Sequence, residues 1–256
     1  MLDVHSDLQD RLERLRAQPR RLLAVFPHPD DEAYGCAGLL HRCGQRDDTA
    51  SALITLTRGE ASTVYAARGL TREQVGDLRA ERLEQVQRLT GLDELIVGSF
   101  PDGRLARLPV AHVAEQIGRV IDALRPQVVV GHCPRGVNGH ADHIATHWIL
   151  RHALSTRPGV RFAMITYPQD VAEAAKPRLL FPTRDNEMDA ALDLTPDEVD
   201  AKEACLQVHE GIVTLKAEGD GLKLPRPTTE FFDLLGEDHA PWLDDVFDGL
   251  TLVPHT

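Results

Sequence analysis

The sequence predicts an α/β fold of the Rossmann-like, doubly wound type, in which helices cover both faces of a mostly parallel sheet. Between residues 21 and 170, short apolar runs alternate with longer segments of helical periodicity. Such alternation is typical of parallel strands joined by helical crossovers. A chain of 256 residues with 42% apolar residues is long and apolar enough for one large domain.

The expected elements follow from the spacing of apolar residues. Strands are expected at 21–26, 51–57, 94–99, 127–132 and 160–167. Helices are expected at 32–43, 71–89, 110–124, 144–154 and 194–212. Thr71 and Gln74 fit a capping box at the start of the second of these helices. Right-handed connections favour the common strand order 3-2-1-4-5.

Two segments flank the predicted core of residues 21–170. Leucines at positions 2, 8, 12 and 15 lie on one face of a helix, so residues 1–20 are expected to pack as an amphipathic N-terminal helix. Beyond residue 170 the alternation loosens, and residues 223–245 are expected to form loop and short helices. We therefore expect a single domain, in which residues 171–256 form a C-terminal flank or lid.

Composition and charge argue against several classes of partner. With 28 basic and 40 acidic residues the net charge is -12, which disfavours binding to nucleic acid or to an anionic membrane. No stretch reaches the roughly 18 apolar residues of a membrane span, and the first 21 residues have no apolar core typical of a secretory signal. The four cysteines, at 36, 43, 133 and 205, form no C-x-x-C pair. Reduced thiols and a cytoplasmic location are expected.

Two polar stretches follow predicted strands. PHPDDE (27–32) comes after the first strand, and HCPRGVNGHADH (132–143) comes at the end of the fourth. In the expected strand order the first and fourth strands are neighbours, and ligands bind in the crevice at the carboxyl ends of such strands. The layout alone therefore predicts that these two stretches form one site.

The residue types in these stretches point to metal-assisted hydrolysis. The candidates are His28, Asp30, Asp31, His140, Asp142 and His143. A catalytic zinc takes three ligands from His, Asp or Glu and keeps a fourth position for water, whose pKa it lowers towards 7. A nearby carboxylate can then take the proton of that water. Adjacent aspartates suit this division, because one can bind the metal while the other acts as base.

Other interpretations stay open at this point. Asp30 and Asp31 could cap the following helix. His143 and His147, four residues apart, could form an exposed helix face or a different zinc pair, although Ile144 stands where an H-E-x-x-H motif needs glutamate. The glycine-rich loops of dinucleotide-binding and P-loop proteins are absent, and so is G-x-S-x-G.

PHPDDE and GHADH together resemble the A-H-P-D-D-E and H-P-D-H signatures of the LmbE-like, or PIG-L, family of metal-dependent N-deacetylases. Weaker similarities accompany them at TRGE (57–60), LRAERLEQVQRLTGL (78–92), PDGRL (101–105) and DAKEACLQVHEG (200–211). The resemblance covers residues 21 to 212. Pro27 replaces the usual alanine, Ala141 replaces the usual proline, and Asn138 stands where some relatives have a tyrosine near the oxyanion site.

The resemblance implies roles for the motif residues. His28, Asp31 and His143 would bind zinc, one ion per chain, although Fe²⁺ uses the same ligand types. Asp30 would be the general base that activates the bound water and returns its proton to the leaving amine.

Four further roles are carried over in the same way. His140, as a cation, would stabilise the oxyanion, and Asp142 would orient His140 and keep it charged. Arg79 and Asp102 match positions that contact the sugar in relatives acting on N-acetylglucosamine conjugates.

The expected function is a zinc-dependent hydrolase that removes acetyl from an N-acetylated amino sugar, such as an N-acetylglucosaminyl conjugate, and releases acetate and a free amine. The alternative is a metal-dependent amidase acting on a thiol conjugate or a specialised metabolite. A non-catalytic metal- or sugar-binding module would require loss of the base, but Asp30 is present. The expected partner is thus a small amino-sugar conjugate, and the sequence leaves a homo-oligomer open.

Overall fold

The computed structural model describes the chain except for residues 3–4, 64–66, 68, 176–179, 210–227 and 253–256. In the described part, one sheet has seven strands in the order β3-β2-β1-β4-β5-β7-β6. The strands are β1 (Arg20–Phe26), β2 (Thr49–Thr55), β3 (Glu94–Val97), β4 (Val128–His132), β5 (Arg161–Thr166), β6 (Ala190–Asp193) and β7 (Thr229–Leu234). Strands β1 to β5 are parallel to one another, and the expected order 3-2-1-4-5 is confirmed.

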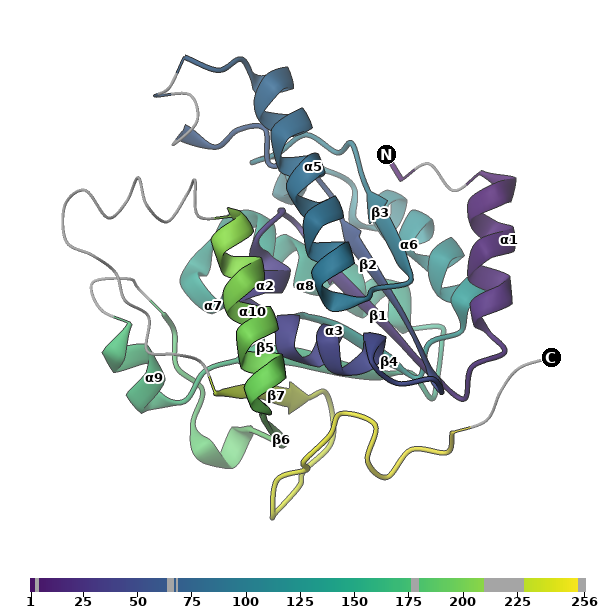
Figure 1. Ribbon diagram of the computed structural model, residues 1–256, viewed down its shortest axis with the longest axis vertical. Coiled ribbons are helices and arrows are strands. Elements are labelled where there is room, and N and C mark those ends of the chain that lie inside the picture. Colours follow the sequence, from purple (N-terminus) through teal and green to yellow (C-terminus); the bar gives the residue numbers. More distant parts are fainter. Residues whose placement is uncertain (3–4, 64–66, 68, 176–179, 210–227, 253–256) are drawn as a thin grey trace.

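Helices cover both faces of the sheet, as expected (Figure 1). α3 (Ala37–Gly44), α5 (Arg72–Thr90) and α10 (Pro196–His209) pack together on one face, and α6 (Val110–Leu124) packs with α1 (Ser6–Leu15) and α8 (Ala141–Leu154) on the other. Shorter segments are α2 (Asp31–Gly35), α7 (Gly136–Gly139), α9 (Gln169–Ala174), η1 (Leu105–Arg107) and η2 (Asp185–Glu187). No helix in the described part of the chain is both long and apolar enough to cross a membrane.

Local sequence explains several element boundaries. The predicted capping box is present, since the Thr71 hydroxyl accepts from the Gln74 N–H and the Gln74 side chain accepts from the Thr71 N–H. The single helix expected at 32–43 is instead two helices that meet at Cys36, which has non-helical backbone angles. α1 inserts Leu8 and Leu12 into the core, with 3% and 0% exposed, and burial of each contributes roughly 1.5–3 kcal/mol.

The expectation of loop and short helices for residues 223–245 was wrong for residues 229–234, whereas the residues from 235 to 245 form turns and loop. Instead of loop and short helices, Thr229–Leu234 forms β7, which is antiparallel to β5 and β6. The strand TEFFDL alternates half-buried and buried residues, with Glu230, Phe232 and Leu234 buried. Glu230 breaks the apolar alternation in the sequence, which hides the strand. The C-terminal segment therefore extends the central sheet.

Asp233, on β7, gives a testable stability prediction. Burial raises its pKa from 3.8 to about 6, and the charges of Asp189 and Glu187 add to the rise. The folded state therefore holds this proton more tightly than the unfolded state, so ionisation above pH 6 destabilises the fold. Asp233→Asn should increase the free energy of unfolding at pH 8 by about 1 kcal/mol, less than the full pKa shift corresponds to, because solvent screens a partly exposed group. The gain should shrink towards pH 4. An equal gain at both pH values, measured by denaturant unfolding, would contradict this.

Candidate active site

The two polar stretches meet at the carboxyl edge of the sheet. β1 and β4 are parallel neighbours, with Leu22 beside Val128. His28 lies just after β1, and His143 lies near the start of α8, which follows β4. The centroids of their rings are 5.3 Å apart. The prediction that these stretches come together is confirmed.

His143 presents a ring nitrogen to a carboxylate. Its Nδ1 lies 3.0 Å from the carbonyl oxygen of Gly136. Because a carbonyl only accepts, Nδ1 carries the proton, and Nε2 of the neutral ring is a lone pair. That Nε2 lies 3.2 Å from Oδ1 of Asp31. Two acceptors therefore face each other, and a proton or a metal ion must lie between them.

His28 has the same arrangement. Its Nε2 lies 3.2 Å from Asp102 Oδ1 and 3.4 Å from Asp142 Oδ2, so Nε2 is the donor, and Nδ1 faces Asp31 Oδ2 at 3.4 Å. Although burial lowers the pKa of His28, the three carboxylates raise it well above its usual value. Burial raises the pKa of Asp31, but the neighbouring histidines hold it well below its usual value. The carboxylates thus favour a charged His28, and the histidines favour an ionised Asp31.

The donor set fits a divalent metal. Two imidazole nitrogens and a carboxylate, from His28, His143 and Asp31, are the kind of set that holds a catalytic zinc. Each histidine is oriented through its other nitrogen by a carbonyl or a carboxylate, as metal-bound imidazoles are. Among the described residues, three groups have donor atoms within 4.8 Å of one another: His28, His140 and His143; Asp31, His132 and His143; and His28, Asp102 and Asp142. None of these groups contains His28, Asp31 and His143 together: the set inferred from the sequence shares two residues with each of the first two groups and one with the third.

Asp30 lies beside this cluster and belongs to none of the three groups. It makes no capping hydrogen bond to α2, and its backbone has φ 116° and ψ -24°, a left-handed conformation that is strained for a residue with a side chain. Its Oδ2 lies 3.2 Å from the guanidinium of Arg79. Burial raises the pKa of Asp30, while the charge of Arg79 lowers it. The structure thus holds a second carboxylate next to the donor set but outside it.

Arg79 and Asp102, expected to contact the sugar, both reach the cluster and are bound there to protein groups. Arg79 is 4% exposed and donates to the carbonyl oxygens of Gly59, at 2.9 Å, and Pro29. Asp102 is 8% exposed and pairs with His28. Their role as sugar contacts stays a prediction, and the contacts seen hold neighbouring site residues in place.

The contact between Asp142 and His140 differs from the expected one. The Asp142 carboxylate accepts from the backbone N–H groups of Gly103 at 2.8 Å and Leu105 at 3.0 Å, while His140 Nδ1 accepts from the Asp142 N–H at 3.2 Å. The reason is local, since His140 caps α8 and Asp142 lies in its first turn. Burial and the charge of His28 lower the pKa of His140. A neutral His140 carries its proton on Nε2 and can donate without being a cation.

His132 was not singled out from the sequence, although it belongs to the cluster. It is the last residue of β4, is 4% exposed, and places Nε2 3.8 Å from Asp31 Oδ1. Its ring stacks on that of His143 at 4.0 Å and 5°. His132 therefore packs against the His143 ring, and it belongs with Asp31 and His143 to one of the three groups able to hold a metal ion. A histidine that ends a buried apolar strand is the signal that could have identified it.

His147 is buried, so the alternative of an exposed helix face for His143 and His147 is wrong. Its Nδ1 donates to the carbonyl oxygen of His132 at 3.0 Å, and its ring packs against Phe162. His147 therefore ties α8 to β4 from behind the cluster.

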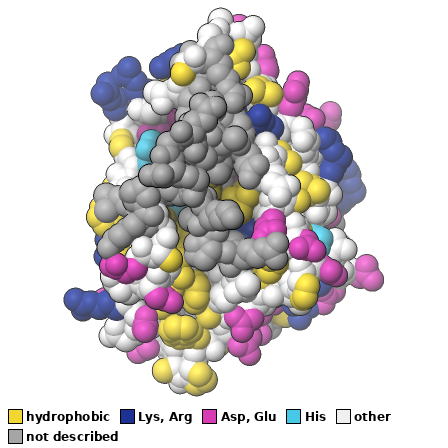
Figure 2. Space-filling model, turned by 60° about the vertical axis from the view of Figure 1, so that its left-hand side comes forward, with side chains coloured by type: hydrophobic (Ala, Val, Ile, Leu, Met, Phe, Trp, Pro, Cys, Tyr) yellow, Lys and Arg dark blue, Asp and Glu magenta, His cyan; other side chains and the backbone are white. Residues whose placement is uncertain are grey.

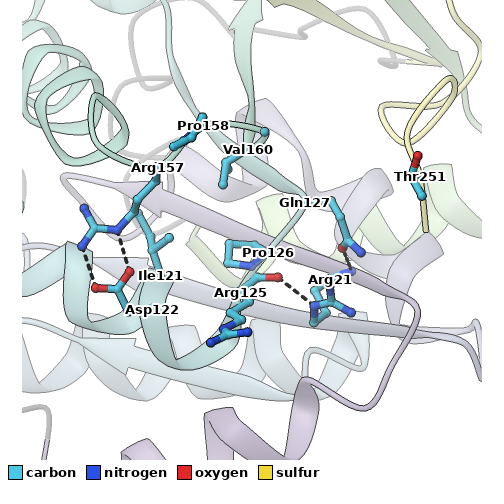
Figure 3. Close-up of a pocket in the computed structure, with 11 residues that line it drawn as sticks. Arg21, Ile121, Asp122, Arg125, Pro126, Gln127, Arg157, Pro158, Val160 and Thr251 are labelled. Carbon is cyan, nitrogen blue, oxygen red and sulfur yellow. Dashed lines mark hydrogen bonds and ion pairs between the residues drawn. The ribbon is translucent and has the colours of Figure 1, made fainter. Parts of the chain in front are cut away.

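A cavity of about 470 Å³ lies at the edge of the sheet opposite the candidate site (Figure 3). Residues from the amino ends of β1, β4 and β5 line it, and the lining residues that the structure describes include no histidine. Two of its arginines are held by protein groups: Arg157 donates to the Asp122 carboxylate at 2.8 and 2.7 Å, and Arg21 donates to the backbone carbonyl of Arg125 at 2.8 Å. This cavity offers none of the chemistry gathered around Asp31.

The surface charge agrees with the acidic composition. Figure 2 shows a face on which the described Lys and Arg side chains lie apart from one another and are interspersed with Asp and Glu. On this face the described residues form no basic patch of the kind that binds nucleic acid.

Comparisons with known proteins agree on a family. Over 280 residues, 91% of this chain and 90% of the relative, the chain is 26% identical to a 1D-myo-inositol 2-acetamido-2-deoxy-alpha-D-glucopyranoside deacetylase of Mycobacterium sp. (strain KMS). Over 140 residues, 54% of this chain and 61% of the relative, it is 31% identical to a probable N-acetyl-alpha-D-glucosaminyl L-malate deacetylase 2 of Bacillus anthracis.

A solved structure shares the fold. The zinc-inhibited form of teicoplanin deacetylase Orf2 matches with a TM-score of 0.63 and 18% identity, over 84% of this chain and 96% of that one. The family model described as PIG-L, GlcNAc-PI de-N-acetylase, matches residues 23–154, which contain the end of β1, all of β2 to β4 and both motif stretches. The chain belongs to the PIG-L family of de-N-acetylases.

Proposed function

We propose that the protein is a zinc-dependent hydrolase that removes acetyl from an N-acetylglucosaminyl conjugate and releases acetate and a free amine. One observation carries the proposal. Two histidines direct a ring nitrogen at the Asp31 carboxylate, each with its other nitrogen bonded to a carbonyl or a carboxylate, while the neighbouring carboxylate of Asp30 stays outside that donor set. Metal-assisted hydrolysis of an amide needs these two functions, a metal site and a separate base.

The residues divide the work as follows. His28, Asp31 and His143 hold the metal, which when bound supplies Lewis acidity and a water of lowered pKa. Asp30 takes the proton of the attacking water and returns it to the leaving amine. Burial raises its pKa, which makes it a stronger base at neutral pH than an exposed aspartate. His140, at the edge of the cluster, donates its Nε2–H to the oxyanion of the tetrahedral intermediate.

The substrate class is supported by the relatives. Their names share a 2-acetamido or N-acetyl glucosaminyl group joined to a polar partner, inositol in one case and malate in the other. We infer a substrate of this class, in which the amino sugar is the constant part. We also infer a reducing compartment such as the cytoplasm, because all four cysteines are buried free thiols.

Acetate release tests the proposal. Purified, zinc-loaded protein should release acetate from N-acetylglucosaminyl conjugates of inositol or malate, with a kcat/KM at least about tenfold above that for an N-acetylated amino acid of similar size, because only the former engages sugar contacts. A higher kcat/KM on acylated thiol conjugates that lack the sugar would instead support the amidase alternative. No acetate release from any amino-sugar conjugate would overturn the proposal.

A further inference from the structure

A buried pair of side chains, Glu32 and His209, reaches the backbone of Asp30. Glu32 is 0% exposed and His209 is 1% exposed. Their Oε1 and Nε2 atoms are 2.6 Å apart. The other carboxylate oxygen of Glu32, Oε2, accepts from the N–H of Asp30 at 3.0 Å. The contact joins residues 177 positions apart in the sequence. Glu32 lies on α2, and His209 is the last residue of α10.

The backbone of Asp30 needs such support. Its left-handed conformation, with φ 116°, is strained for a residue with a side chain and persists only when its surroundings hold it. Arg79 holds the carboxylate at 3.2 Å, and Glu32 holds the N–H. The two contacts fix Asp30 from its two ends, so the direction of its side chain depends on both.

His209 keeps Glu32 in place. A buried carboxylate without a partner is costly. Among the described residues, the Glu32 carboxylate has hydrogen bonds only to the Asp30 N–H and to His209. Without His209, this carboxylate would leave the pocket or take up a proton, and either change weakens its bond to Asp30.

Attachment of α10 does not depend on this pair. Two other ion pairs join α10 to the body: Lys202 with Glu230 at 2.5 Å, and Arg42 with Glu198 at 2.8 Å. Neither pair includes Asp30 or a member of the three His and Asp groups. The Glu32–His209 pair differs from them because it ends on the residue proposed as the base.

We propose that Glu32 and His209 are positioning residues for the general base, through which the last helix of the core fixes the backbone of Asp30. The proposal rests on the proposed function, because it takes Asp30 as the base. It also gives a purpose to the third acidic residue of PHPDDE, which binds the base and takes no part in the metal cluster.

Kinetics of three variants test the pair. His209→Ala and Glu32→Ala should each lower kcat about 10- to 100-fold, as loss of a residue that orients a functional group does. KM and the zinc dissociation constant should stay within about threefold of wild type, because the hydrogen bonds that the structure gives these two side chains go to each other and to the Asp30 N–H, not to the donor set. His209→Gln should recover most of kcat, because its amide can still donate to Glu32. If Glu32→Ala does not fold, the comparison of His209→Ala with His209→Gln carries the test.

Glu198→Gln is the matched control. It removes the carboxylate charge from the partly buried Arg42–Glu198 pair of α10 and does not affect the contacts of Asp30. It should therefore lower the denaturation midpoint and leave kcat unchanged. Equal kcat losses in Glu198→Gln and His209→Ala, or a wild-type kcat in folded His209→Ala, would overturn the proposal.

A readout that needs no turnover separates this proposal from the proposed function. Amide hydrogen exchange at Asp30, followed by NMR, should be at least about tenfold faster in His209→Ala than in wild type, and unchanged in Glu198→Gln. If the wild-type protein releases no acetate, the proposed function fails, and this exchange rate alone decides whether the pair holds Asp30. Unchanged exchange in His209→Ala would overturn the positioning role.

Discussion

Asp30→Asn is expected to lower kcat for acetate release by about 100- to 10,000-fold, the range attributed to general acid–base catalysis. Asparagine keeps the shape of the side chain and can still accept from Arg79, so the left-handed backbone and the donor set around Asp31 are preserved. The amide cannot take a proton from water. Bound zinc, measured by elemental analysis, should therefore stay at one ion per chain while kcat falls.

The control for this prediction is Asp122→Asn. Asp122 is an exposed aspartate at the opposite edge of the sheet, where it pairs with Arg157, so kcat should remain at the wild-type value. Wild-type turnover in Asp30→Asn would show that Asp30 is not the base. A parallel loss of zinc and turnover would instead make Asp30 a metal ligand.

His143→Ala is expected to abolish zinc binding at stoichiometric metal and, with it, turnover. The substitution removes the nitrogen that faces Asp31 at 3.2 Å. Loss of a residue that only orients a ligand weakens metal binding about 10- to 100-fold, so loss of a ligand should exceed that. The dissociation constant can be measured by competition with a coloured chelator.

The chain offers a matched control on the same helix. His147 is also buried, lies one turn further along α8, and bonds to the backbone carbonyl of His132 rather than to a side chain of the cluster. His147→Gln should therefore bind one zinc with wild-type affinity, even if the protein is less stable. Equal loss of zinc in both variants would show that the metal depends on the packing of α8 rather than on the His143 nitrogen.

Much of the fold could be predicted because the signals are local. The β1 to β5 segments are short apolar runs separated by helical patterns, and crossover handedness then limits the strand order. β7 could not be predicted in this way, because it contains the buried Glu230. The carboxylate of Glu230 accepts hydrogen bonds from Lys202 on α10 and from the N–H groups of Gly38 and Leu39. Such a polar residue reads as exposed until its partners are known.

For the site, the sequence predicted which stretches meet but not how each side chain is directed. PHPDDE and GHADH lie at strand ends that topology brings together, so their meeting could be anticipated without coordinates. The direction of each side chain could not. Whether Asp142 would face His140 or the Gly103 N–H depends on where α8 begins, and helix boundaries are poorly defined by sequence. The contact of His209 with Glu32 depends in turn on the position of α10, which sequence spacing does not provide.

Metal reconstitution tests the central claim most directly. Protein stripped with a chelator should release no acetate from its best N-acetylglucosaminyl conjugate, and added Zn²⁺ should restore turnover in proportion until one ion is bound per chain. Asp30→Asn, titrated in parallel, should bind the same single ion without regaining turnover. Full activity in the stripped wild-type protein, or activity in metal-loaded Asp30→Asn, would contradict a mechanism in which His28, Asp31 and His143 hold the metal and Asp30 is the base.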